Sequence, residues 1–505
     1  MNSPFDDYIS TDFAVLYENA TPAKDEPEIL HLLWGDGVQV LEQGTKRTRV
    51  RARGRNLNGW VDKGCLGGKS LLEYYFIDVG QGDGVLIKTP DFQHLLIDGG
   101  WPRSSQDTGK NAADFVDWKF YQDYAMNQIE LEAMICSHND QDHYGGLWDM
   151  LNPKEKAELD VNKVLVRDFY HAGLGWWKKG TKKTLGEYET ADGESFFTQL
   201  MGDRAHLEAS VGGGNSPQLA GEWAHFLRCV TASTWKAGKQ TTIHRLSHID
   251  HHLPGFSVNS DDKPAIRVLG PVEFDLDGRK AIRRFPGGDS KNTNGNSIML
   301  RVDFGRTRVI LTGDLNKSSQ TFLLKDYEGQ TQEFECDVAK ACHHGSDDVS
   351  YSFLQRLRPA VTVISSGDNE GHDHPRPSIV AASATTGHFE IKDDELVSPL
   401  VFSTELARSV SFGKPFKAEI KSTSGAVEST LESPEDLHRC MVHFKETKSG
   451  DRNPKSKSRS LRHMKVVAGL IYGLVNVRTD GDTILCATLD EKDHHWRIHK
   501  IKSRF

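Results

Sequence analysis

The stretch that decides the fold is L-E-A-M-I-C-S-H-N-D-Q-D-H-Y-G-G, which runs from Leu131 to Gly146. Its first part, which ends at Cys136, is an apolar run that predicts a buried strand. Because the next loop leaves a strand end, its alternating side chains can turn toward one point, and we expect them to share one cation or a close pair. From the residues alone, the alternative is a polar turn whose histidines are incidental. The loop residues of metal-ligating type are His138, Asp140, Asp142 and His143.

More side chains of this kind follow later apolar strands. The strand 309–311 ends in T-G-D, the run that ends in A-C leads into H-H-G-S, and the strand 361–364 precedes an asparagine, a histidine and H-P. Sites of α/β proteins form beyond the carboxyl ends of strands, so we expect these groups to meet the first loop. The residues concerned are Asp314, His343, His344, Asn369, His372 and His374.

Six ordered motifs resemble those of the metallo-β-lactamase superfamily. They are F-I-D-V-G-Q-G-D from Phe76 to Asp83, L-I-D-G-G from Leu96 to Gly100, S-H-x-D-x-D-H-x-G-G, T-G-D, H-H-G-S and H-P. More narrowly, the set resembles the branch that contains the soluble domain of the ComEC-type DNA-uptake protein. The resemblance covers about 71–380 and implies an α/β fold, the four-layer αββα sandwich.

The resemblance also implies metal-binding roles. His138 and Asp140 would serve a first metal ion, and Asp142 and His143 would serve a second. Asp314 would bridge the two ions. The sequence departs from the lactamases proper at Asp140, where they have a second histidine.

Two histidines remain interchangeable at this level. His374 would complete the second metal site, but the family's middle histidine is missing from 294–297, which reads N-G-N-S. Either His343 or His344 fills that place, and the other lies near the substrate as a proton donor or phosphate contact. The predicted catalytic residues are therefore Asp142, His343 and His344.

A pair of metal ions would explain this density of ligands. Two cations about 3.5–4 Å apart stabilise the attacking and leaving oxygens and bring the pKa of a bound water toward neutrality. The carboxylate of Asp140 favours manganese, with zinc as the alternative. Asp78, Asp83 and Asp98 are expected to orient ligands or to pin turns.

Glycine clusters and composition shifts divide the chain into four parts. Residues 1–68 are predicted to form a small β-barrel-like module, which resembles a bacterial Src-homology-3-like domain. Residues 69–440 are predicted to form the hydrolase domain, with an insertion at about 151–264. A basic linker over 441–465 and a small strand-rich unit over 466–505 complete the chain.

Five side chains are candidates for contact with the substrate. Trp177 could stack on a base or sugar, and Lys178 and Lys179 could contact phosphates. Asn369 and His372 lie near the last ligand motif. The alternatives for the insertion residues are a packed lid and solvated charges.

Composition limits the compartment and the partners. The 505 residues include 62 Lys and Arg and 71 Asp and Glu, a net charge of −9 that does not favour nucleic acid globally but permits a local basic patch. The sequence contains no run of about 18 apolar residues, the length that a membrane-spanning helix needs. The start of the sequence lacks the basic and apolar parts of a secretory signal, and seven scattered cysteines are typical of reduced thiols, so we expect a cytoplasmic protein.

These features predict a dinuclear metal-dependent hydrolase. It would cleave phosphodiester bonds by attack of a metal-activated hydroxide, with nucleic acid as the substrate. The alternative is a small-molecule hydrolase that acts on a cyclic nucleotide, a phosphorylcholine ester or a lactone. A third hypothesis is a scaffold with a relic site. The N-terminal β-module would be the contact for a partner protein.

Overall fold

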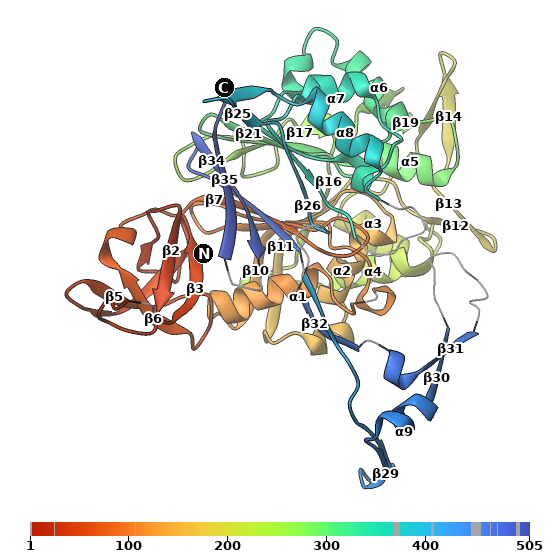
Figure 1. Cartoon of the computed structure of the whole chain (residues 1–505). Helices are drawn as coiled ribbons and strands as arrows, with labels where there is room; N and C mark the ends of the chain where they lie inside the picture. The colour runs from red at the N-terminus through yellow and green to blue at the C-terminus, as the bar shows by residue number, and fades with distance from the viewer. Residues whose placement is uncertain are drawn as a thin grey trace.

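The computed structural model is mixed α/β, as the sequence predicts (Figure 1). It describes residues 3–24, 26–106, 108–367, 374–405, 409–445, 456–464, 466–471, 473–490 and 495–505. Within these residues, no helix combines the length and the apolar character that crossing a membrane requires.

The largest sheet has nine strands in the order β16-β11-β10-β9-β8-β7-β33-β34-β35. Strands β9, β10, β11 and β16 run parallel, so their carboxyl ends meet at one edge. The first two strands of this sheet in chain order, β7 and β8, form an antiparallel hairpin. The strands are β7 (Leu72–Ile77), β8 (Val85–Lys88), β9 (His94–Ile97), β10 (Gln128–Cys136), β11 (Lys163–His171), β16 (Thr242–Arg245), β33 (Leu474–Thr479), β34 (Thr483–Asp490) and β35 (His495–Lys502).

A second sheet has six strands in the order β17-β20-β21-β22-β23-β26. Its last four strands run parallel and end at the same side of the molecule as the metal-ligand loop of the first sheet. The strands are β17 (Ala265–Gly270), β20 (Met299–Phe304), β21 (Thr307–Leu311), β22 (Val338–Lys340), β23 (Val361–Ile364) and β26 (Leu400–Ser403).

The two sheets pack face to face, and helices cover the outer face of each (Figure 1). The alternation along β7 shows why: Tyr75 and Ile77 pack toward the helices, whereas Tyr74 and Phe76 pack toward the second sheet. Strands buried on both faces need apolar residues at every position, which explains their continuous apolar runs. The covering helices are α1 (Ala112–Trp118), α2 (Gln141–Leu151) and α4 (Gly221–Ala232) on the large sheet, and α6 (Lys317–Asp326), α7 (Tyr351–Leu357) and α8 (Pro377–Thr386) on the other.

The N-terminal residues form a six-stranded all-β unit with its own apolar core. Charged contacts tie it to the large sheet, because Arg478 of β33 pairs with Asp36 of this unit at 2.6 Å and with Glu73 of β7 at 3.5 Å. Its strands are β1 (Asp7–Tyr8), β2 (Phe13–Tyr17), β3 (Glu28–Leu33), β4 (Gly37–Gln43), β5 (Arg47–Arg51) and β6 (Asn58–Asp62).

Three boundaries differ from those expected. The interval 151–264 contains β11 and β16, so it contributes two strands to the large sheet and is not wholly an insertion. The small unit expected over 466–505 contributes β33, β34 and β35 to the large sheet, and β33 covers the edge of β7 that would otherwise lack a partner. Within 441–465, β30 (Met441–Lys445) pairs with β31 (Ser456–Ser460), so the described part of the basic segment is a hairpin.

Apart from α3 and α5, the remaining elements lie at the periphery. A four-stranded sheet, β14-β15-β19-β18, stands beside the carboxyl-terminal edge of the large sheet, and smaller hairpins form the projecting part at the lower right of Figure 1. These elements are β12 (Trp177–Lys179), β13 (Lys182–Thr184), β14 (Tyr188–Ala191), β15 (Glu194–Phe197), β18 (Glu273–Leu276), β19 (Arg279–Arg284), α3 (Arg204–Val211), α5 (Asp289–Gly295), β24 (Glu390–Lys392), β25 (Glu395–Ser398), β27 (Ser409–Gly413), β28 (Ala418–Lys421), β29 (Val427–Leu431), α9 (Pro434–Arg439) and β32 (Val466–Ile471).

Candidate metal centre

The candidate centre lies where strands of both sheets end. Strand β10 ends at Cys136, the loop continues to Asp140, and α2 begins at the next residue. The 3-10 turn Cys342–Gly345 follows β22 and carries two histidines with left-handed backbone, His343 at φ 48° and His344 at φ 52°. Non-glycine residues rarely adopt this conformation, and the strain of about 1–3 kcal/mol each is typical of functional sites.

Asp314 occupies the middle of the cluster. Its Oδ2 atom lies 3.2 Å from His143 Nε2 and 3.1 Å from His344 Nε2. Asp142 approaches the same two imidazoles, with Oδ1 4.0 Å from His143 Nε2 and Oδ2 3.8 Å from His344 Nε2. The side chains of Asp314, His143 and His344 are buried, so two imidazoles converge on carboxylates away from bulk water.

A second layer of carboxylates fixes these imidazoles. His143 donates from Nδ1 to Asp98 at 2.9 Å, and His344 donates from Nδ1 to Asp83 at 3.1 Å. Each Nε2 atom is thereby turned toward Asp314, as in sites where an outer carboxylate orients a histidine ligand. Lys340 is also buried and forms an ion pair with Asp83. Asp78 differs from these two carboxylates because it accepts from the Gly80 and Gly473 amides and so pins a turn.

The other side of the cluster contains His138 and Asp140. His138 Nε2 lies 3.8 Å from Asp140 Oδ2, which also accepts from Thr293 Oγ1 at 2.8 Å. The side-chain amide of Asn294 donates to Asp140 at 3.0 Å and accepts from His343 Nε2 at 3.3 Å. Asn294 therefore links Asp140 to His343 in the place where the sequence lacks the family's middle histidine.

The electrostatics of the cluster separate its groups. Burial and the neighbouring Asp142 raise the pKa of Asp140 to about 7. Burial and nearby imidazoles lower the pKa of His138 well below its ordinary value, which keeps its ring neutral. Burial opposes the charge on His344, but Asp314 and Asp83 outweigh it and raise the pKa of that imidazole to about 10. The cluster thus concentrates acids and bases whose pKa values depend on one another.

The donor set fits divalent metal ions. Several buried atoms that point inward have no hydrogen-bond partner among the described residues: His138 Nε2, His344 Nε2 and Asp314 Oδ1. Buried polar atoms are normally paired, so orphaned atoms that converge indicate a ligand. Among the described residues, four groups of three ligand atoms lie within 4.8 Å of one another. They are His138 with His143 and Asp314, Asp142 with His143 and His344, Asp83 with Asp98 and His143, and Asp83 with Asp314 and His344. Imidazole nitrogen and carboxylate oxygen suit both zinc and manganese.

The structure separates the two adjacent histidines. His344 is buried between Asp83 and Asp314, whereas the side chain of His343 is 26% exposed and lies 3.8 Å from Asp314. The ring of His374 lies 5.7 Å from that of His343 and 6.5 Å from that of His344. His374 is half-buried and belongs to none of the ligand sets formed by the described residues.

The structure places the expected substrate contacts in different environments. The expectation for Trp177 is corrected, because its side chain is only 2% exposed and packs in the helix-side core, where it cannot stack on a ligand. Its neighbour Trp176 instead donates from Nε1 to the Asn139 carbonyl of the metal-ligand loop at 3.0 Å. Lys178 and Lys179 are exposed on the β12–β13 hairpin. The remaining two predicted contacts, Asn369 and His372, lie outside the described residues.

Sequence reasoning missed three residues at the centre. Thr293 and Asn294 hold Asp140, and Lys340 pairs with the carboxylate that orients His344. The buried lysine three residues before the histidine pair was the available signal, since an unpaired buried ammonium is costly. Nothing in the sequence pattern marks Thr293.

Comparisons with known proteins give short or weak likenesses. No family model matches the chain. ComE operon protein 3 of Bacillus subtilis (strain 168) is 31% identical over 93 residues, and competence protein ComA of Neisseria gonorrhoeae is 33% identical over 87 residues. These matches cover 18% and 17% of this chain. The matched part amounts to 12% of the length of each relative.

Similar solved structures include metal-dependent hydrolases. One belongs to the β-lactamase superfamily, with 12% identity and a TM-score of 0.29 over 66% of this chain and 96% of that one. Another is a diphosphatase from the PhnP family, with 12% identity and a TM-score of 0.27 over 61% of this chain and 90% of that one.

Proposed function

We propose that the chain is a metal-dependent hydrolase of the metallo-β-lactamase superfamily, in its ComEC-like branch, that cleaves phosphodiester bonds of nucleic acid. One observation carries the proposal: the carboxylate of Asp314 lies within 3.2 Å of two buried imidazoles. Its Oδ1 atom and the Nε2 atom of His138 have no hydrogen-bond partner among the described residues. A relic site has no reason to retain such a cluster. The face-to-face sheets with outer helices support the αββα sandwich.

We assign the ligands from their placement. His138 and Asp140 would hold one metal ion, and Asp142, His143 and His344 would hold the second, with Asp314 between them. His374 remains a proposed ligand of the second ion. Two zinc or manganese ions would polarise the phosphoryl oxygen and lower the pKa of the attacking water.

The chain's own residues prepare this chemistry. Asp98 and Asp83 accept hydrogen bonds from Nδ1 of the two ligand imidazoles, which directs each Nε2 toward the metal site. His343 donates from Nε2 to Asn294, so that nitrogen carries a proton at the more open side of the cluster. We assign to the imidazolium form of His343 the donation of this proton to the leaving oxygen, which returns the ring to its neutral form.

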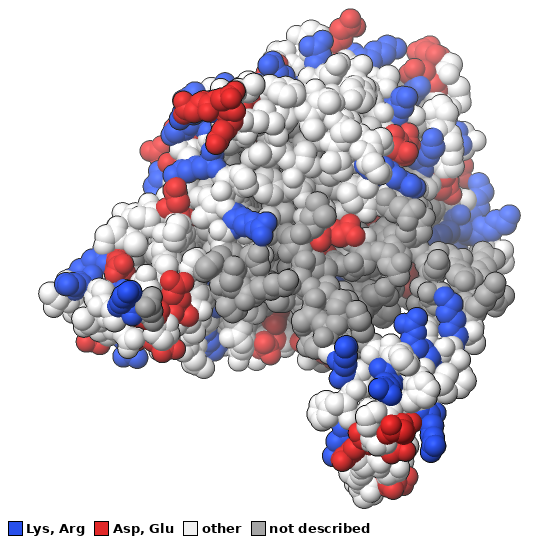
Figure 2. Space-filling model, viewed as in Figure 1, with Lys and Arg blue, Asp and Glu red and all other residues white. Residues whose placement is uncertain are grey.

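Basic side chains beside the centre support a phosphate-bearing substrate. Figure 2 shows Lys and Arg gathered over the β12–β13 hairpin, which contains Lys178, Lys179, Lys182 and Lys183. Lys183 lies 4.2 Å above the ring of Trp176, which in turn donates to the metal-ligand loop. Lysines placed in this way can neutralise phosphates next to the scissile bond. We also retain as proposals a cytoplasmic location and a protein partner for the N-terminal β-unit.

The test combines metal content with activity. Purified protein should contain about two metal ions per chain and cleave single- or double-stranded DNA with manganese or zinc. Asp314→Asn should lower cleavage by more than about 100-fold, the upper range for loss of an outer-shell partner. The control is Asp275→Asn, which alters an aspartate on the peripheral strand β18. Full activity of Asp314→Asn would refute the mechanism.

Other outcomes select the alternatives. Cleavage of bis-p-nitrophenyl phosphate without cleavage of DNA would identify a small-molecule hydrolase, and cyclic nucleotides, phosphorylcholine esters and lactones would then be tested. A protein that binds no metal and hydrolyses none of these would be a scaffold.

A further inference from the structure

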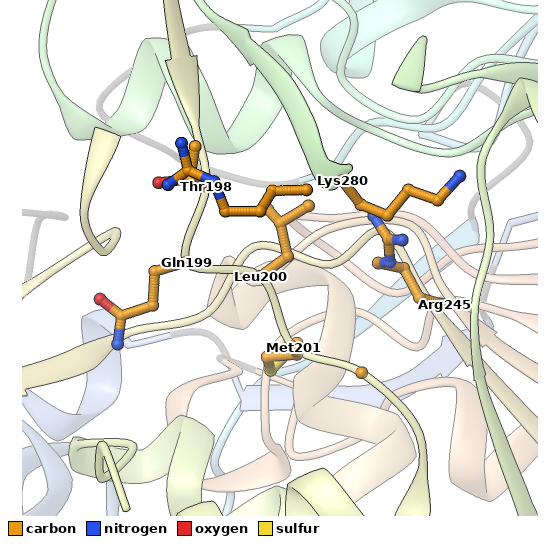
Figure 3. Close-up of a pocket in the computed structure, with 8 residues that line it drawn as sticks. Thr198, Gln199, Leu200, Met201, Arg245 and Lys280 are labelled. Carbon is orange, nitrogen blue, oxygen red and sulfur yellow. The ribbon is translucent and has the colours of Figure 1, made fainter. Parts of the chain in front are cut away.

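Figure 3 shows a pocket of about 460 Å³ lined by several basic side chains. We call it the basic pocket and define it by residues 198–202 together with Arg245, Arg279 and Lys280. The segment 198–202 follows β15, Arg245 ends β16, and the other two cations begin β19. No part of the proposed catalytic centre uses these side chains.

The cations of the pocket are incompletely neutralised. Arg245 and Lys280 share one carboxylate, Glu273, at 2.8 Å and 2.7 Å. Arg279 pairs with Glu189, and both side chains are about half exposed. Three cations therefore face two carboxylates, which leaves one formal positive charge. Exposed pairs such as Arg279–Glu189 are weak and can yield to a stronger anion.

Arg245 has an unused donor. Its side chain is 17% exposed, and its Nη1 atom is buried without a hydrogen-bond partner among the described residues. A guanidinium offers its donors as a planar fork that matches the oxygens of a phosphate. Because buried donors are normally satisfied, this arrangement points to an absent anionic partner.

The pocket belongs to the same edge of the large sheet as the metal centre. Cys136 pairs with His171, and His171 pairs with Arg245, so Arg245 lies two strands from the start of the metal-ligand loop. At roughly 4.8 Å per strand, the two backbones are about 10 Å apart. Leu200 of the pocket packs in the same cluster as Trp176, whose ring nitrogen binds that loop.

We propose that the basic pocket is an anion subsite that holds a phosphate group of the substrate other than the one being hydrolysed. This inference rests on the proposed phosphodiester hydrolysis and narrows it to substrates with more than one phosphate. A strand of nucleic acid has this character, and an isolated diester does not. The subsite binds and positions the substrate and takes no part in bond cleavage.

The experiment compares substrates with one and with several phosphates. Arg245→Gln should raise KM for a short single-stranded DNA oligonucleotide roughly tenfold, the equivalent of one hydrogen bond to a charged group. It should leave kcat/KM for bis-p-nitrophenyl phosphate unchanged. Arg279→Gln should also raise the oligonucleotide KM. Because Arg279 is exposed, this variant tests the subsite even if Arg245→Gln does not fold. Arg245→Lys should restore part of the loss.

The matched control is Lys236→Gln. Lys236 is a half-exposed cation paired with Glu130, near the opposite end of β10. It should change neither substrate's constants. If Arg245→Gln and Arg279→Gln leave the oligonucleotide KM unchanged, or if folded variants lose activity on both substrates equally, the subsite is refuted.

A binding measurement separates this inference from the proposed function. Inorganic pyrophosphate is titrated calorimetrically into the wild type and into Arg245→Gln. If the wild type hydrolyses no diester but binds pyrophosphate through Arg245, the anion subsite stands and phosphodiester hydrolysis fails. If the wild type is active and neither binding nor KM responds to Arg245→Gln, the subsite fails and the proposed function stands.

Discussion

Two buried clusters of charged side chains differ in how their charges are satisfied. At the joint between the N-terminal unit and the large sheet, Arg478 lies 2.6 Å from Asp36, and Lys88 lies 2.5 Å from Glu73. At the candidate metal centre, by contrast, no Lys or Arg of the described residues forms an ion pair with Asp140, Asp142 or Asp314. The first cluster gives its carboxylates cations of the chain, whereas the second gives its carboxylates only imidazoles.

This difference separates structural charges from functional ones. Both clusters contain buried carboxylates, so burial alone does not distinguish them. The joint offers each carboxylate a cation of the chain, which is how a buried charge becomes tolerable. The centre leaves inward-pointing imidazole and carboxylate atoms unpaired, which is what a metal site needs.

The largest effect is expected at the histidine pair. His344→Gln should abolish binding of the second metal ion and, as a result, hydrolysis. His343→Gln should keep the metal content and lower kcat by about 10²–10⁴-fold, the usual range for loss of a general acid. Elemental analysis and steady-state kinetics on both variants measure this split. Equal metal loss in the two variants would show that both histidines are ligands.

The next effect concerns stability at the joint. Arg478→Met should lower the free energy of unfolding by about 3–5 kcal/mol, because it leaves Asp36 and Glu73 buried with fewer cations. The control, Arg306→Met, removes an exposed pair with Asp482 and should change it by about 0–1 kcal/mol. Urea denaturation measures both. A similar small change in the two variants would contradict the structural role of Arg478.

The smallest effect is the pH dependence of that joint. Burial alone would raise the pKa of Asp36, but Arg478 and Arg53 outweigh it and lower that pKa below its ordinary value. A carboxylate with a lowered pKa stabilises the fold above its unfolded pKa of about 3.9 and loses this contribution as the pH falls below it. The free energy of unfolding should therefore decrease below about pH 4, and less steeply in Asp36→Asn. Identical pH profiles of the two proteins would show that Asp36 does not cause the pH dependence of stability.

The sequence predicted the centre better than its surroundings. Ligand-type residues that follow strands are local signals, so the meeting of His138, Asp142, His143 and Asp314 could be expected before the structure was known. Asn294 could not be assigned, because its role depends on contact with Asp140, which is distant along the chain. Adjacent residues of a strand point to opposite faces of the sheet, so the sequence could not show which of the rings of Trp176 and Trp177 would be buried.

The pairing of strands that are distant in the chain could not be predicted from the sequence either. The pairing of β7 with β8 joins neighbouring stretches of the chain, but the pairing of β33 with β7 joins residues about four hundred positions apart. Register of this kind depends on which edge is left open, and no local pattern encodes it.

The pairing of β33 with β7 has a consequence for synthesis. Asp78 follows β7 directly and accepts from the Gly473 amide at 3.0 Å, and the same turn leads to the carboxylate that orients His344. A nascent chain that has emerged only as far as β26 already carries the candidate ligands from His138 to His374 but has an open edge on β7. The edge of β7 is therefore covered only after β33 has been synthesised, so we expect the centre to mature no earlier than that strand.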